Sequence, residues 1–236
     1  MKNIVSNPRS AACILSLFLA VSNFAQTVEK SVQWTPPTPR LKASRVFSPK
    51  PIAGHNIFKG EADKWLADAI LKLEVEKLDV IENKAITDYV NQVGRNLGLY
   101  SKGPKKEFEF IVLEDEDADA FNLGGGRIYI TLGMLREVAN EDELAGVLAH
   151  EIGHDVFQHA AKAVTRQMFW LTGTPKINSA ADAEKALEAL NEKLHNTPIA
   201  VASEVMLGFA RFAELEADRA AFYNLHKAGY NPRFFR

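Results

Sequence analysis

The sequence predicts an α+β fold that is mostly helical and contains one small β-sheet. After residue 60, apolar residues recur every three or four positions over most of the chain, as they do on the buried face of a helix. Two short segments, 107–113 and 127–131, instead alternate apolar and polar residues, as half-buried strands do. Because the strand-like segments are few and are flanked by helical ones, we expect a small sheet that packs against helices.

The 236-residue chain has 47% hydrophobic and 25% charged residues, which is the composition of an ordinary globular protein. Its length fits one domain with extensions and is sufficient for a sizeable core. The formal net charge of −2 and the lack of a lysine- or arginine-rich face argue against nucleic acid as a partner.

Residues 1–25 have the order of a secretory signal peptide. Lys2 and Arg9 precede an apolar run, 11–21, which small residues follow. The run is short for a membrane span, and an uncleaved N-terminal membrane anchor is the alternative. Cys13, the only cysteine, lies inside the run, so we expect no disulfide in the mature protein. We predict an exported protein, either periplasmic or secreted.

Residues 26–60 are rich in proline and have no sustained apolar period, so we expect a linker or a strap that lies on the surface. The folded domain is expected over 61–236. Its first helix begins at Glu61, and a second helix covers 84–98, with one apolar face.

An acidic stretch and three glycines separate the two strand-like segments. Three aspartates at alternate positions from Asp115 have the spacing of a calcium loop. Such a loop requires a glycine and a glutamate at the positions of Ala120 and Gly126, so we expect a solvated turn instead.

The second half of the chain is predicted to be helical. A long helix begins after Asn140, a good N-cap with Glu143 three residues on, and runs to about Phe169. A charged amphipathic helix follows around 181–195, and a last helix covers 198–229.

The long helix contains the motif H-E-x-x-H. His150 and His154 are four residues apart and project from one face, so both can bind one metal ion. Glu151 is rotated by about 100° and flanks the ion without binding it. The pattern is typical of two zinc-binding imidazoles and a glutamate that acts as general base on a metal-activated water. Two helix histidines satisfied by ordinary hydrogen bonds are the alternative.

A catalytic zinc ion needs a third protein ligand and an open position for water. The metzincin continuation fails, because Phe157 and Ala160 stand where glycine and histidine are required and His159 is one residue out of register. The last helix carries Glu214 on its apolar stripe, with Asp218 close beside it. A carboxylate on an apolar stripe is costly unless it is paired or metal-bound. We therefore predict Glu214 as the third ligand and Asp218 as the residue that orients a histidine ring.

The same helical geometry places Glu216 on the opposite side of the last helix, away from the predicted ligands. The alternative for Glu214 and Asp218 is that they form surface ion pairs with Arg211 or Arg219, which contribute little and need no apolar stripe.

Several motifs together resemble the M48 zinc metallopeptidases, which are gluzincins, in their exported, BepA-like type. They are "HEIGH", "ELEAD" and "AGYNP", supported by "AITDYVNQVGRNL", "DAFNLGGGRIYIT" and "EDELAGVLAHEIGHD". The resemblance runs from about residue 61 to residue 232. It implies a zincin-type metallopeptidase domain with the sheet next to the H-E-x-x-H helix. It also implies that Glu214, which opens E-x-x-A-D, is the third zinc ligand, and that Arg211 lies near the site.

This reading predicts a zinc-dependent endopeptidase, with one zinc ion per chain, that cleaves unfolded or misfolded polypeptides in protein quality control. Membrane-associated or envelope proteins are possible clients, and the oligomeric state stays open. A zinc-containing, chaperone-like binding factor with little proteolysis is the main alternative, and a non-proteolytic zinc hydrolase is another. Glu151 argues against the binding factor, because a structural metal site has no use for a general base.

We expect the substrate to pair with the strand 127–131 as an edge strand beside the zinc, an arrangement that the resemblance favours. Gly125 and Gly126 lead into this strand and let another backbone approach, and Ile128 offers a main-chain donor. "NLGGG" replaces the family's "ALPGG", so we expect a more flexible loop. In the alternative, the strand is paired on both sides and the glycines form only a turn.

Overall fold

The computed structural model describes residues 55–74, 78–101, 107–195 and 199–234. The predicted signal peptide, 1–25, and most of the predicted linker, 26–60, lie outside these ranges. Across the described ranges, no helix combines the length and the apolar character that a membrane crossing requires.

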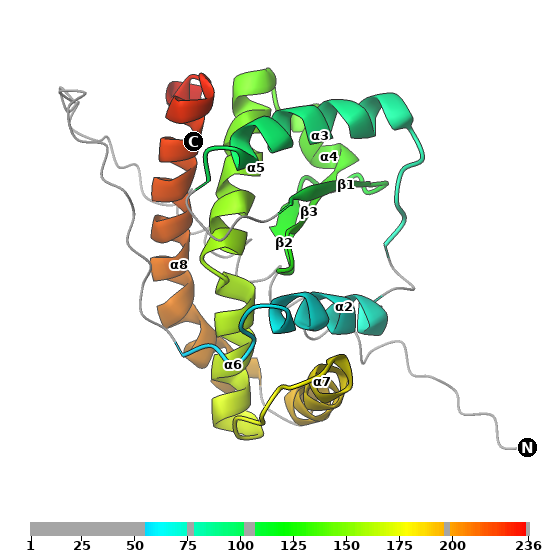
Figure 1. Cartoon of the computed structure of the whole chain (residues 1–236), viewed down its shortest axis with the longest axis vertical. Helices are drawn as coiled ribbons and strands as arrows, with labels where there is room; N and C mark the ends of the chain where they lie inside the picture. Colours follow the sequence, from blue (N-terminus) through cyan, green and yellow to red (C-terminus); the bar gives the residue numbers. More distant parts are fainter. Residues whose placement is uncertain (1–54, 75–77, 102–106, 196–198, 235–236) are drawn as a thin grey trace, which may run out of the picture.

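The described residues form helices around a small sheet, so the predicted α+β class is confirmed (Figure 1). The helices are α2 (Ala62–Glu74), α3 (Lys84–Gly98), α4 (Leu132–Glu137), α5 (Glu141–Val156), α6 (His159–Leu171), α7 (Ala180–His195) and α8 (Ile199–Ala228). The strands are β1 (Glu109–Leu113), β2 (Ala120–Asn122) and β3 (Arg127–Thr131), and a 3-10 turn, η2 (Pro232–Phe234), follows α8. Helix α8 runs alongside α5, the helix that carries H-E-x-x-H.

The sheet has the strand order β1-β3-β2, so the prediction that 127–131 is an edge strand is wrong. Strand β3 pairs with β1 in parallel along its whole length and with β2 in antiparallel fashion. Strand β2 comes from the end of the acidic stretch that was expected to be a solvated turn. It pairs because Phe121 lies opposite Tyr129 and stacks on it, with ring centroids 5.0 Å apart.

The two faces of the sheet point into two different apolar cores. Ile128 and Ile130 pack with residues of α3, α5 and α8, whereas Tyr129 packs with residues of α2, α6 and α7. This division follows from the alternation of side chains along a strand. Phe58, in the described end of the predicted linker, is fully buried in the second of these cores.

The three glycines before β3 form a held turn and not a flexible loop. Gly124, Gly125 and Gly126 all have positive φ, at 93°, 69° and 85°, where only glycine is unstrained. Gly125 N–H donates to Asp63 Oδ2 at 3.0 Å, and Gly126 N–H donates to Asp155 Oδ2 at 2.8 Å. These carboxylates tie the turn to α2 and α5 and occupy the N–H groups of Gly125 and Gly126, while Ile128 lies in a strand paired on both sides.

The predicted long helix is interrupted between α5 and α6. Its start agrees with the prediction, because Asn140 is the N-cap and its side chain accepts from Glu143 N at 3.0 Å. At Gln158 the backbone enters the left-handed region with φ 55°, and α6 begins at the next residue, His159. The two helices therefore differ in register, with consequences for the site.

Candidate metal centre

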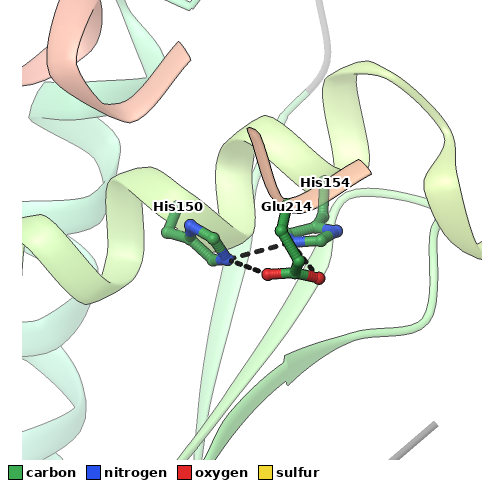
Figure 2. A group of neighbouring side chains, drawn as sticks. All are labelled: His150, His154 and Glu214. Atoms are coloured by element: carbon green, nitrogen blue, oxygen red, sulfur yellow. Dashed lines mark hydrogen bonds and ion pairs between the residues drawn. The ribbon is translucent and has the colours of Figure 1, made fainter. Parts of the chain in front are cut away.

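Three predicted ligands converge at the contact between α5 and α8. Helix α5 contributes His150 and His154 from adjacent turns, and α8 contributes Glu214, whose side chain points at both rings (Figure 2). The Nε2 atoms of the two histidines are 2.9 Å apart. Glu214 Oε2 lies 3.2 Å from His150 Nε2, and Glu214 Oε1 lies 3.6 Å from His154 Nε2.

The donor atoms and their spacing suit a zinc ion. Zinc binds imidazole nitrogen and carboxylate oxygen at about 2.0–2.2 Å in a tetrahedral arrangement, which separates neighbouring donors by roughly 3.3 Å. The three separations, 2.9, 3.2 and 3.6 Å, lie on both sides of that value. Three protein donors also leave a fourth position open, as catalytic zinc sites do.

Helix α8 comes close enough to supply Glu214 because α5 has a glycine at the contact. A Cβ atom at Gly153 would lie 2.9 Å from the carbonyl oxygen of Ala217 and 3.0 Å from its Cα. Both are backbone atoms of α8, one turn after Glu214. Gly153 thus allows the two helix backbones to approach, and the carboxylate reaches the imidazoles.

Asp218 holds the far side of the His150 ring. Its Oδ1 lies 3.0 Å from His150 Nδ1, which leaves Nε2 directed at Glu214. Burial acts to lower the pKa of His150, but hydrogen bonds to Asp218 and Glu214 outweigh it and raise the pKa to about 10. Surroundings that stabilise positive charge on this ring also suit a cation beside it.

The ring of His154 is held in a different way, through a residue that the sequence reasoning set aside. His154 Nδ1 lies 3.0 Å from His159 Nδ1, and His159 Nε2 lies 3.0 Å from Glu216 Oε2. His159 and Glu216 are only 5% and 3% exposed. Burial lowers the pKa of His159 to about 2, with nearby His154 acting in the same direction, so the ring is neutral at physiological pH.

Glu216 is therefore linked to the predicted ligand His154 through His159, which the sequence analysis did not predict. It lies on another side of α8 from Glu214, as predicted, but that side packs against the start of α6 and not against solvent. On an unbroken helix His159 would be rotated by about 140° from His154. The change of direction at Gln158 brings the two rings together, and no glycine or proline in the sequence signals it.

Glu151 lies buried on α5 between the two histidines in sequence, with 9% of its surface exposed. Burial raises its pKa, while His150 and His154 act in the opposite direction. A buried carboxyl with a raised pKa, next to a cluster of metal-type ligands, is typical of a catalytic acid or base.

With this geometry in view, comparison with known proteins identifies the family. The family described as "Peptidase family M48" matches residues 82–236. The chain belongs to peptidase family M48. The resemblance inferred from the sequence motifs is therefore confirmed.

Curated relatives of this M48 chain include proteases of bacteria and mitochondria. It is 29% identical over 160 residues to the β-barrel assembly-enhancing protease of Escherichia coli (strain K12), covering 65% of this chain and 32% of that protein. It is 28% identical over 179 residues to a putative β-barrel assembly-enhancing protease of Vibrio cholerae, covering 71% and 36%. It is 31% identical over 127 residues to the mitochondrial metalloendopeptidase OMA1 of Arabidopsis thaliana, covering 53% and 24%. The chain spans about a third or less of these relatives' length.

Arg211, predicted to lie near the site, is exposed on α8. Among the described residues it forms no hydrogen bond or ion pair with the metal-type cluster, whereas Asp218 does. Strand β2, by contrast, is tied to α5 beside the cluster. Asn122 Nδ2 donates to Asp155 Oδ2 at 3.0 Å, and Asp155 directly follows His154.

Proposed function

We propose that this M48 chain is a zinc-dependent endopeptidase with one zinc ion, held by His150, His154 and Glu214. The convergence of these three side chains, with Glu151 buried beside them, carries the proposal. The donor set fits zinc in type and spacing, and the family is one of metallopeptidases. The fourth position would be left to water and substrate.

Each residue of the cluster has a distinct task in this proposal. When bound, a zinc ion there would polarise the scissile carbonyl and make water more acidic. Glu151 accepts the proton from that water and delivers it to the leaving amine, and burial makes its carboxylate a stronger base for this purpose. Asp218 keeps the His150 ring oriented through Nδ1.

We further propose that the substrates are unfolded or misfolded polypeptides, bound in extended form. The central position of β3 moves the proposed docking edge to β2, whose outer side pairs with no other strand among the described residues. The hydrogen bond between Asn122 and Asp155 joins this edge to the helix of the two histidines. A peptide that adds to a free edge through its main chain is recognised with little regard to sequence.

The signal-like order of residues 1–25 supports a protein that is exported and acts in quality control outside the cytoplasm. Relatives named as β-barrel assembly-enhancing proteases make envelope or membrane-associated proteins reasonable clients to test. The competing function is a zinc-containing binding factor with little proteolysis. The two functions are distinguished by the rate at which the protein cleaves a bound polypeptide.

The deciding experiment compares the wild-type protein with Glu151→Gln and Glu214→Ala, each supplied with zinc. Glu151→Gln should bind zinc and fold normally but cleave denatured casein about 10²–10⁴ times more slowly, because an amide does not accept the proton. Glu214→Ala should lose zinc, whereas Arg211→Ala, on the exposed side of the same helix, should keep it. Client binding without cleavage by the wild-type protein would favour the binding factor.

A further inference from the structure

A buried chain of polar groups connects three helices behind the proposed metal ligands. It runs from Glu216 on α8 through His159 at the start of α6 to His154 on α5, with both links 3.0 Å long. This chain lies on the side of the His154 ring away from Glu214. His154 is its only member among the proposed ligands, and it does not include the Asp218 contact with His150.

The order of donors and acceptors along this chain follows from its chemistry. The Glu216 carboxylate can only accept, so His159 Nε2–H donates to it. A neutral imidazole has one N–H, so His159 Nδ1 carries a lone pair and accepts. His154 Nδ1–H must then donate to His159, which leaves the lone pair of His154 on Nε2, the atom that faces Glu214 and His150.

The backbone at the join of α5 and α6 adopts an unfavourable conformation that makes this chain possible. Gln158 has φ 55°, which non-glycine residues rarely adopt without compensation. Its side-chain oxygen accepts from Asn56 Nδ2 at 3.1 Å. Its positive φ changes the direction of the polypeptide backbone, so that the His159 ring meets His154. Unfavourable backbone geometry of this kind concentrates at functional sites.

The two proposed histidine ligands are thus held by partners in different surroundings. The Asp218 side chain that faces His150 is 47% exposed, whereas Glu216 at the end of the His154 chain is 3% exposed. Water competes for the first contact but is excluded from the second, and a buried hydrogen bond orients its partner more firmly.

We propose that His159 and Glu216 are positioning residues that fix the tautomer and the orientation of His154, so that its Nε2 lone pair is directed at the metal before the ion arrives. The proposal rests on the metal site proposed above and assigns a role to two residues outside the ligand set. Groups that support a ligating histidine typically change metal affinity about 10–100-fold when they are removed.

The test compares two substitutions at His159 whose side chains both branch at Cγ. In His159→Asn the side-chain oxygen takes the place of Nδ1 and still accepts from His154, whereas His159→Leu has no acceptor. Zinc affinity of the purified full chain is measured by competition with a chromophoric chelator, and the visible spectrum of the Co²⁺-loaded protein reports the ligand geometry. His159→Leu should weaken zinc binding about 10–100-fold and change the Co²⁺ spectrum, while His159→Asn keeps most of the affinity.

Thr165→Val is the matched control. Thr165 is a buried polar residue of α6 that accepts a hydrogen bond from Ile57 N–H and is not part of the Glu216–His159–His154 chain. It should lower the melting temperature and leave zinc affinity unchanged. If the His159 variants do not fold, Glu216→Gln replaces a charged acceptor by a weaker neutral one of the same shape and should weaken zinc binding several-fold.

The outcomes separate this inference from the proposal on which it rests. A wild-type protein that binds no zinc removes the metal site itself. If the wild-type protein binds zinc and His159→Leu binds it with the same affinity, the positioning role is overturned. It is also overturned if His159→Leu and His159→Asn lose the same amount of zinc affinity. Unchanged affinity in Glu216→Gln overturns it in the same way.

Discussion

Gly153→Ala should uncouple zinc binding from folding stability. The new Cβ would lie 2.9–3.0 Å from backbone atoms of Ala217, whereas non-bonded carbon atoms pack at about 3.5–4.0 Å, so α8 must move by roughly 0.5 Å. Glu214 is one turn away on the same helix and moves with it. Metal sites require ligand distances within about 0.2 Å, so we expect zinc affinity to fall about tenfold or more.

The same substitution should cost little stability. Overpacking at a helix contact costs about 1–3 kcal/mol. Alanine is about 1 kcal/mol more favourable than glycine inside a helix, which offsets part of that loss. The metal-free variant should therefore melt only slightly below the wild-type protein.

The assay pairs thermal melting of the metal-free protein with zinc competition against a chelator. Gly133→Ala, whose Cβ would clash with the backbone of Glu116 and Asp117 and not with α8, is the control for a backbone clash. It should reduce the melting temperature while the folded protein binds zinc normally. Wild-type zinc affinity in Gly153→Ala would refute the argument that this glycine sets the approach of α8.

Two further predictions follow from the sheet and its surroundings. Ile128→Pro should unfold the protein, because β3 is central and proline removes a donor from a strand paired on both sides. The measurement is loss of the cooperative melting transition. A variant that stays folded and loses only cleavage would contradict this. Burial, together with nearby Asp115 and Asp117, raises the pKa of Asp119 to about 6 despite the hydrogen bond from Ala120 N–H, so the folded state binds this proton more tightly than the unfolded state does. Stability from this group is therefore present below about pH 4 and lost as the pH rises through about 6, and urea titrations should show a flatter profile in Asp119→Asn.

The parts of the fold that local sequence determines were predicted well. Helix α3 has the bounds expected from its apolar face, and Asn140 caps α5 as its side chain suggested. The position of Glu214 on the buried stripe of α8 was also predictable, because it follows from the 3.6-residue period. These features depend on residues within one or two turns of each other.

The parts that long-range contacts determine were not predicted. Strand β2 is only three residues long, with the small Ala120 and the polar Asn122 at its ends, and it forms because the Phe121 ring stacks on Tyr129. The break at Gln158 depends on Asn56, 102 residues away, and on the burial of His159 beneath α8. Helical periodicity located Glu216 on the right side of α8 but carried no information about which neighbouring helix covers that side.

About one and a half turns of α5 contact α8, α6, β2 and the turn before β3. His150 contacts Asp218 of α8, Gly153 admits the α8 backbone, and His154 meets the first residue of α6. Asp155 accepts from Asn122 of β2 and from the turn before β3, and Ile152 is fully buried in the core. Since each of these residues has a fixed external partner, the proposed ligands stand on a segment that cannot rotate or slide without breaking several contacts. The rigidity that a metal site needs is thus built from the sequence immediately around H-E-x-x-H, together with the elements that surround it.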